Sequence, residues 1–171
     1  MVRTPTAAGR CNPFAGEHDL EHHRQPLKES PLTSKQMIFR LTLASNPRSI
    51  GRVEGFLHKV GKSISLDEIQ FHKLMVSLTE AVNNAIVHGN KVRPTKKVRV
   101  ICELLPGWIL LMIHDEGKGF KPEKVGNPLT KENLLRESGR GIFLMRTLMD
   151  KVEFDVGKGG TEVRLWLDVY K

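Results

Sequence analysis

The stretch that decides the fold is Glu-Ala-Val-Asn-Asn-Ala-Ile-Val-His-Gly-Asn at residues 80–90. It ends a long run, starting near Leu66, in which apolar residues recur at helical spacing. At about 100° per residue, one side of this helix collects several apolar side chains. They are Leu74, Leu78, Ala81, Val82 and Ala85. The pattern predicts a helix over about 66–88 with that side packed on a core.

A polar stripe follows the same predicted helix. Glu80, Asn84 and His88 are spaced at i, i+4 and i+8, so a carboxylate, an amide and an imidazole line up. An unpaired polar group out of water costs roughly 1–3 kcal/mol, so such groups either find partners or serve chemistry. The stripe therefore predicts a cavity above it. The alternative is a solvated helix face that ends in a Gly89 cap.

Length and composition indicate one domain with a tail. The chain has 171 residues, and 39% of them are hydrophobic, which suits a single full core. We expect a flexible N-terminal extension over residues 1–35 and a domain over 36–171, because the first segment holds scattered prolines and no periodicity. His18, His22 and His23 could bind a metal, but they lack carboxylate or thiol partners at a fixed spacing.

Hydropathy, cysteine content and net charge indicate the cellular compartment and the kind of binding partner. No apolar run approaches the roughly 20 residues of a membrane helix, and the N-terminus lacks the apolar block of a signal peptide. We therefore expect a cytoplasmic protein without membrane contact. Cys11 and Cys102 form no metal-ligand spacing, and Cys102 lies in an alternating apolar stretch that predicts burial. The formal charge of +8 favours an anionic partner, which could be nucleic acid, a nucleotide or an acidic protein.

The order of predicted elements indicates the fold class. A helix capped by Ser45 or Asn46, with Pro47 at its first position, precedes the long helix, and Gly139-Arg140-Gly141 opens another. Strands are predicted near 37–43, 97–104, 108–114, 152–156 and 161–169. This order predicts an α/β fold, a two-layer α/β sandwich with a mixed, mostly antiparallel sheet covered on one face by helices. The polar stretch that ends near Ser138 is typical of a functional lid or of disorder.

Two glycine motifs add chemistry to this frame. Asp115-x-Gly117-x-Gly119 follows a strand, where the carboxylate can accept a hydrogen bond from an exocyclic amine and the glycines let the backbone approach a flat ring. Gly139-x-Gly141 opens a helix whose free N–H groups suit a polyphosphate. The spacing of a P-loop is absent, and the glycines do not lie in a βαβ unit.

Taken together, the motifs resemble the Bergerat nucleotide-binding fold of the GHKL superfamily, which includes histidine kinases and DNA gyrase B. Within it, Glu-Ala-Val-Asn-Asn-Ala-Ile-Val-His-Gly, Asp-Glu-Gly-Lys-Gly-Phe and Gly-Arg-Gly-Ile-Phe-Leu-Met are most similar to the anti-sigma factor serine/threonine-protein kinases. The resemblance covers about residues 36–171.

The resemblance implies ATP and Mg²⁺ as cofactors and assigns roles to residues. Asn84 would coordinate Mg²⁺, and Glu80 would be the catalytic base that orients or deprotonates an attacking hydroxyl. Asp115 would read the adenine amine, with Gly117 and Gly119 shaping the base pocket.

The resemblance extends to the phosphates and to the support of the adenine-binding aspartate. Gly139 and Gly141 would bracket the lid and reach the phosphates, while Thr161 matches a threonine that supports that aspartate. Arg140 and His88 are candidate additional phosphate contacts.

The resemblance also implies protein partners. The acceptor would be a serine on an anti-anti-sigma protein of the STAS type, and a sigma factor would be held by an ATP-bound homodimer. Arg48 and Arg52, on the first helix of the domain, would be a candidate sigma-binding surface, with a solvated helix face as the alternative.

Three other functions compete with this interpretation. A nucleotide-gated binding module, an anti-sigma switch with little or no kinase activity, would share the same pocket. A sensor histidine kinase fragment would need a phosphoacceptor histidine on an upstream helical hairpin, and the upstream histidines lie in the irregular tail. A nucleic-acid-binding domain is suggested by the basic residues between Lys91 and Arg99, but interleaved aromatic residues are missing there, so we expect no direct nucleic-acid contact.

Overall fold

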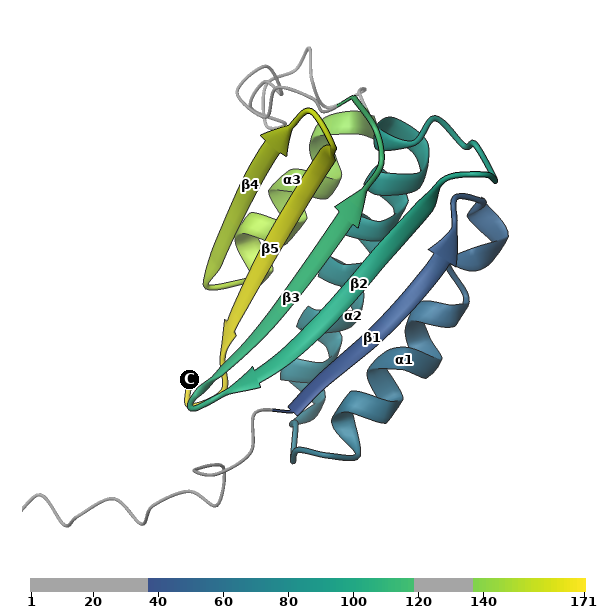
Figure 1. Ribbon diagram of the computed structural model, residues 1–171. Coiled ribbons are helices and arrows are strands. Elements are labelled where there is room, and N and C mark those ends of the chain that lie inside the picture. The colour runs from purple at the N-terminus through teal and green to yellow at the C-terminus, as the bar shows by residue number, and fades with distance from the viewer. Residues whose placement is uncertain (1–36, 119–136) are drawn as a thin grey trace, which may run out of the picture. The chain divides into compact units, whose positions relative to one another are not determined.

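A five-stranded sheet forms one layer of the domain. The computed structural model describes residues 37–118 and 137–171. The strands are β1 (Met37–Ala44), β2 (Lys97–Leu105), β3 (Trp108–Asp115), β4 (Lys151–Gly157) and β5 (Gly160–Asp168). They are ordered β1-β2-β3-β5-β4 (Figure 1). All four neighbouring pairs in this order are antiparallel.

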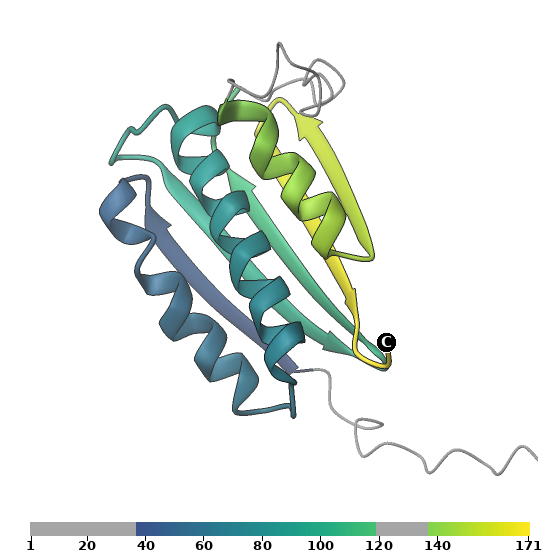
Figure 2. The same cartoon turned by 180° about the vertical axis from the view of Figure 1, so that it is seen from behind.

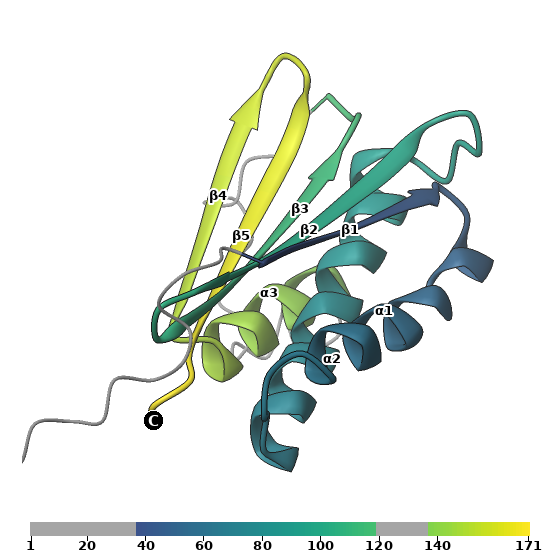
Figure 3. The same cartoon turned by 60° about the horizontal axis from the view of Figure 1, so that its bottom comes forward.

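Helices cover one face of this sheet. They are α1 (Arg52–Gly61), α2 (Glu68–Asn84) and α3 (Glu137–Leu148). Figure 2 shows α2 running between α1 and α3 across the sheet, and Figure 3 shows all three helices on the same side. The predicted two-layer α/β sandwich is therefore confirmed, with the difference that the described sheet is antiparallel throughout and not mixed.

The core lies between the two layers, and the sequence pattern explains which side chains enter it. In β2, the buried residues Val98, Val100 and Cys102 alternate with more exposed ones, as a strand with one covered face requires. On α2, the predicted core residues between Leu74 and Ala85 are all buried. Burial and the nearby Glu103 raise the pKa of the Cys102 thiol to about 12, so this cysteine is a packed apolar side chain rather than a reactive one.

Two predicted helix boundaries need correction. The chain does not enter a helix directly at Pro47: a short 3-10 turn, Pro47–Ser49, comes first, capped by the Asn46 side chain, and α1 begins only at Arg52. The long helix starts at Glu68 with a capping box, and its α-helical part ends at Asn84. Residues Ala85–Gly89 continue it as a π-helical turn, a local widening that is frequent at functional sites.

Some predictions lie outside the described residues. These are the N-terminal extension, with its histidines, and most of the polar stretch up to about Ser138, expected as a functional lid or as disorder, of which residues 119–136 are not described. Within the two described ranges, none of the helices has both the length and the apolar content needed to cross a membrane.

Candidate functional site

Asp115 is the centre of one half of the site. It ends β3 with only 4% of its surface exposed. Its Oδ1 accepts hydrogen bonds from the backbone N–H of Gly117 (2.7 Å) and of Thr161 (3.3 Å). These two donors fix the carboxylate from two elements, and among the described residues no donor reaches Oδ2. One carboxylate oxygen is therefore oriented by the protein while the other can accept a bond from a ligand.

Glycines pack against this carboxylate from several sides. A Cβ on Gly89 would lie under 3.0 Å from Asp115 Cγ and both of its oxygens. A Cβ on Gly117 would collide with the backbone of Gly89, and one on Gly160 with the carbonyl of Asp115. Gly160 also has a φ of +132°, a backbone conformation that residues with a side chain rarely adopt. The carboxylate thus lies in a cradle of bare backbone.

The alternative of a Gly89 helix cap is not what the structure has. The left-handed residues after the π turn are Lys91 (φ 57°) and Val92 (φ 53°), whereas Gly89 has no positive φ. Gly89 is instead required by the close approach of Asp115. Gly89 is the last residue of the π turn, but it does not end the helix through a left-handed conformation.

Thr161 contributes a second kind of signal. It is 1% exposed, and its Oγ1 finds no hydrogen-bond partner among the described residues. A buried hydroxyl without a partner costs about 1–3 kcal/mol. The backbone N–H of the same residue donates to Asp115, so Thr161 is a candidate to contact a ligand beside that carboxylate.

Glu80 and Asn84 form the other half of the site. Both are half-buried on α2, one turn apart, and both face the first turns of α3. A Cβ on Gly141 would lie 2.5 Å from Glu80 Oε2 and 3.4 Å from Asn84 Nδ2. The glycine therefore lets α3 come close to a carboxylate and an amide.

Other predicted site residues lie in α3, in the π turn and in the 3-10 turn after β1. Gly139 and Arg140 lie inside α3, which begins two residues earlier than predicted, and Arg140 is exposed. His88 is exposed in the π turn. Arg48 is exposed in the 3-10 turn after β1, and it does not lie on α1 as predicted.

The last two predicted site residues are Arg52 and Gly119. Arg52 begins α1, and its Nη1 donates to the carbonyl of Thr42 at 3.2 Å. Gly119 lies outside the described residues.

Asn90 is a residue whose role the sequence reasoning missed. It is fully buried, its Nδ2 donates to the carbonyl of Lys97 (2.9 Å), and its Oδ1 accepts from the N–H of Glu116 (2.8 Å). It thereby joins the end of the long helix to the turn after Asp115. Its place directly after the polar stripe was the only available signal, because an asparagine there reads equally well as an exposed turn residue.

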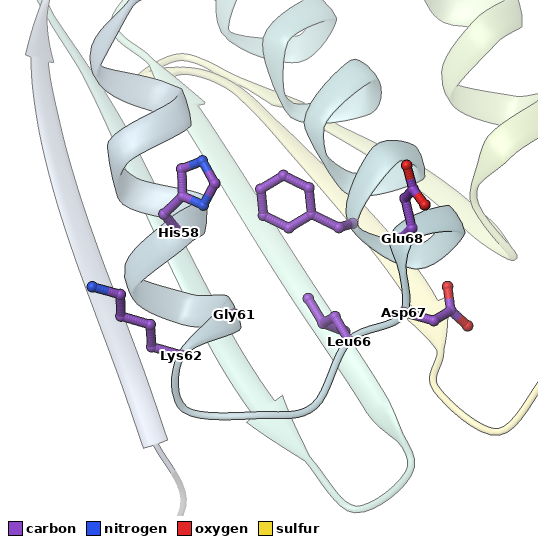
Figure 4. Close-up of a pocket in the computed structure, with 7 residues that line it drawn as sticks. His58, Gly61, Lys62, Leu66, Asp67 and Glu68 are labelled. Carbon is purple, nitrogen blue, oxygen red and sulfur yellow. The ribbon is translucent and has the colours of Figure 1, made fainter.

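A separate groove lies at the opposite end of α1 and α2. It has a volume of about 440 Å³ and includes His58, Leu66 and Phe71 in its lining (Figure 4). The rings of His58 and Phe71 are 5.0 Å apart. None of the predicted site residues lines this groove, so it is distinct from the Asp115 cradle.

The arrangement fits a purine nucleotide with a metal-bound polyphosphate. The glycine cradle, the oriented carboxylate and the free Thr161 hydroxyl suit a flat base with an exocyclic amine. The first turn of α3 suits phosphates, and the Asn84 amide oxygen could ligate a phosphate-bound metal. Among the described residues, no three His, Cys, Asp or Glu side chains converge on a metal position, so Mg²⁺ would take ligands from Asn84, phosphate and water.

Comparisons with known proteins agree with this geometry. The histidine kinase-like ATPase domain family matches residues 43–167. The anti-sigma F factor of Heyndrickxia coagulans is 33% identical over 136 residues, covering 76% of this chain and 90% of that protein. The anti-sigma F factor of Clostridium beijerinckii is 39% identical over 102 residues, covering 58% of this chain and 70% of that protein.

A solved structure supports the fold. The crystal structure of the RsbU and RsbW domains of a Mycobacterium tuberculosis protein superposes with a TM-score of 0.58 at 18% identity, over 78% of this chain and 32% of that longer one. The chain therefore belongs to the histidine kinase-like ATPase family, in the branch that includes the anti-sigma F factors.

Proposed function

We propose that this chain is an ATP-dependent serine/threonine-protein kinase that acts as an anti-sigma factor. It phosphorylates an anti-anti-sigma protein of the STAS type and sequesters a sigma factor. The observation that carries the proposal is the Glu80–Asn84 pair beneath Gly141, because a carboxylate and an amide one turn apart supply a base and a metal ligand at one place. The names of the relatives support the anti-sigma part.

The proposed roles follow from chemistry and position. Bound ATP with Mg²⁺ supplies the phosphoryl group and neutralises its charge. Asn84 holds the metal, Asp115 and Thr161 hold the adenine, and the first turn of α3 receives the phosphates. Glu80 takes the proton of the acceptor serine hydroxyl. At the same time the serine oxygen bonds to the γ-phosphorus, and the bond between that phosphorus and ADP breaks.

The test is phosphotransfer with labelled ATP and Mg²⁺ to each anti-anti-sigma protein encoded in the same genome. Wild type should label a serine or threonine of one of them. Asn84→Ala should lose Mg-ATP binding, while its neighbour Asn83→Ala serves as the matched control and should keep it. Glu80→Gln should bind ATP and transfer no phosphate, with the exposed Glu54→Gln unchanged.

The outcomes separate the proposal from its rivals. Nucleotide binding by folded Asn84→Ala as tight as wild type would remove the metal role. Unchanged transfer by Glu80→Gln would reject the base. ATP binding by wild type with no labelled protein, together with ATP-dependent capture of a sigma factor, would replace the kinase by a nucleotide-gated binding module.

We place the sigma factor on the 3-10 turn before α1, where Arg48 is exposed. Arg52 helps to shape this surface, because its guanidinium already holds the Thr42 carbonyl. Sigma factors work with RNA polymerase, so this function places the chain in the cytoplasm.

The proposed homodimer has a supporting surface on the sheet. On the face opposite the helices, the ring of Trp166 packs edge-on against that of Trp108, with the ring centroids 6.3 Å apart, and Trp166 is paired with Leu110 between β3 and β5. By alternation, basic residues dominate this face on β1 and β2, whereas acidic residues dominate it on β4 and β5.

A two-fold axis would set these opposite charges against each other over the apolar centre. Trp166→Lys should therefore give a monomer in light scattering. Val156→Lys, a change of another exposed apolar residue, should not.

A further inference from the structure

A basic loop follows the π turn and has no role in the proposed phosphotransfer. We call residues 90–96, between the π turn and β2, the basic loop. Lys91, Val92 and Arg93 are consecutive and exposed, and 44% of the Val92 surface is open. A branched apolar side chain thus stands between two cations at the apex of the loop.

The backbone of this apex has an unusual conformation. Lys91 and Val92 both have left-handed φ values, 57° and 53°. A single left-handed residue is common after a helix, but a β-branched residue rarely adopts this conformation. Burial does not compensate Val92, since its side chain is exposed. Glycine or asparagine would adopt this left-handed conformation at a lower energetic cost, so folding alone does not explain a valine here. This points to a role of the valine side chain in binding.

The loop is held rigidly in this form. The N–H of Val92 donates to the carbonyl of Ile86 (2.8 Å), and that of Lys96 donates to the carbonyl of Arg93 (2.9 Å). The carbonyl of Lys96 accepts from the N–H of Ser45 (3.0 Å) at the end of β1. A partner that binds here meets a preorganised surface, so little ordering cost accompanies binding.

The charges of the loop are only partly used within the protein. Lys96 donates to the carbonyl of Glu116, and the Glu116 carboxylate pairs with Arg99 at 2.8 Å. In the part of the chain that the structure describes, no carboxylate lies within ion-pair distance of Lys91 or Arg93. Two cations are therefore available to an anionic partner, with Val92 between them.

The loop also adjoins both surfaces of the proposed function. Through Ser45 it lies beside the 3-10 turn that carries Arg48, as Figures 1 and 2 both show. Through Asn90 it is joined to the turn after Asp115. A partner that contacts Arg48 can therefore reach the basic loop next to the nucleotide site.

We propose that the basic loop extends the sigma-binding surface, with Val92 as an apolar anchor between Lys91 and Arg93 for an acidic, partly apolar segment of the partner. This inference rests on the proposed function. A protein fits better than a nucleic acid, because the apex offers an apolar side chain and no aromatic ring for stacking, and because Glu116 lies beside it.

The experiment measures the affinity of the full chain, with ATP and Mg²⁺, for each sigma factor encoded in the same genome. For the sigma factor that wild type binds, Lys91→Ala/Arg93→Ala and Val92→Ser should each lower the affinity by about tenfold or more. The control, Arg146→Ala/Lys158→Ala, removes two exposed cations, one from the last turn of α3 and one from the turn after β4, and should stay within about twofold of wild type. ATP affinity should be unchanged in every variant, which separates partner contact from damage to the nucleotide site.

Each result decides between the two proposals. If wild type binds no sigma factor, the proposed function fails and this inference falls with it. If wild type binds one and the loop variants bind it equally well, only this inference is overturned. A short DNA duplex is the second probe: binding of the duplex that is lost in Lys91→Ala/Arg93→Ala, with sigma binding intact, would assign the loop to nucleic acid instead.

Discussion

The two ends of α2 are built in opposite ways. At its N-terminal end, Asp67 and Gln70 form a capping box, and Gln70 Nε2 also donates to the carbonyl of Val169 at 3.1 Å. At its C-terminal end the helix widens into a π turn, two residues have left-handed φ values, and the Thr161 hydroxyl nearby lacks a partner. The first end satisfies its polar groups within the protein, whereas the second has an unpartnered hydroxyl nearby and belongs to the proposed nucleotide site. In this proposal, stability and function are separated along one helix.

The largest expected effect tests the ligand end. Gly89→Ala places a methyl group against the Asp115 carboxylate and must displace it. We expect ATP affinity to fall by about 100-fold, or roughly 2.7 kcal/mol, as measured by isothermal titration calorimetry. Gly55→Ala on α1 is the matched control, because a Cβ there meets nothing within 4 Å. It should raise the free energy of unfolding by about 0.5–1 kcal/mol and leave ATP affinity unchanged. Equal ATP binding by both variants would contradict the cradle.

A pair of buried hydroxyls sharpens the same comparison. Among the described residues, neither Thr161 Oγ1 nor Ser77 Oγ has a hydrogen-bond partner. Thr161→Val and Ser77→Ala should therefore each raise the free energy of unfolding by about 1 kcal/mol in urea titrations. Only Thr161→Val should also lower ATP affinity, by about tenfold. If ATP binds Thr161→Val as tightly as wild type, the free hydroxyl is not kept for the nucleotide.

The fold could be predicted from sequence because burial and alternation dictate it. The spacing of apolar residues along the sequence identifies the buried side of α2 and of β2. The sandwich can be predicted from those two buried sides. The break between Pro47 and Arg52 could not be predicted, since a capping asparagine followed by proline starts a 3-10 turn as readily as an α-helix.

Residues of a candidate site could be proposed from the sequence, whereas the contacts between them could not. The Glu80, Asn84 and Asp115 signals were visible as spacing and as a strand-end motif. The contact of Gly89 with Asp115 depends on how the end of a helix packs against the end of the central strand β3, and no local sequence pattern encodes that packing. The same holds for Asn90, whose partners lie in two other segments.

A moderate effect is expected at the stability end. Asp67→Ala removes the acceptor for the N–H of Gln70, a bond of 2.7 Å, and should cost about 1 kcal/mol of unfolding free energy. ATP affinity should not change, because the cap lies at the far end of α2 from Asp115. Asp67→Asn keeps an acceptor oxygen and should recover most of the loss. A drop in ATP affinity in a folded Asp67→Ala protein would show that the two ends of the helix are not separate.

The smallest expected effect is a pH dependence at the same stability end. Asp150 precedes β4, and its pKa is held below the ordinary value of 3.8, first by the backbone N–H of Asp168 and then by Lys171. The unfolded chain therefore takes up this proton at a higher pH than the folded one. The stabilisation is present at neutral pH and is lost as the pH falls through about 4 and below. The melting-temperature difference between wild type and Asp150→Asn should accordingly narrow from pH 7 to pH 3. A difference that stays constant over this range would contradict a lowered pKa of Asp150 in the folded protein.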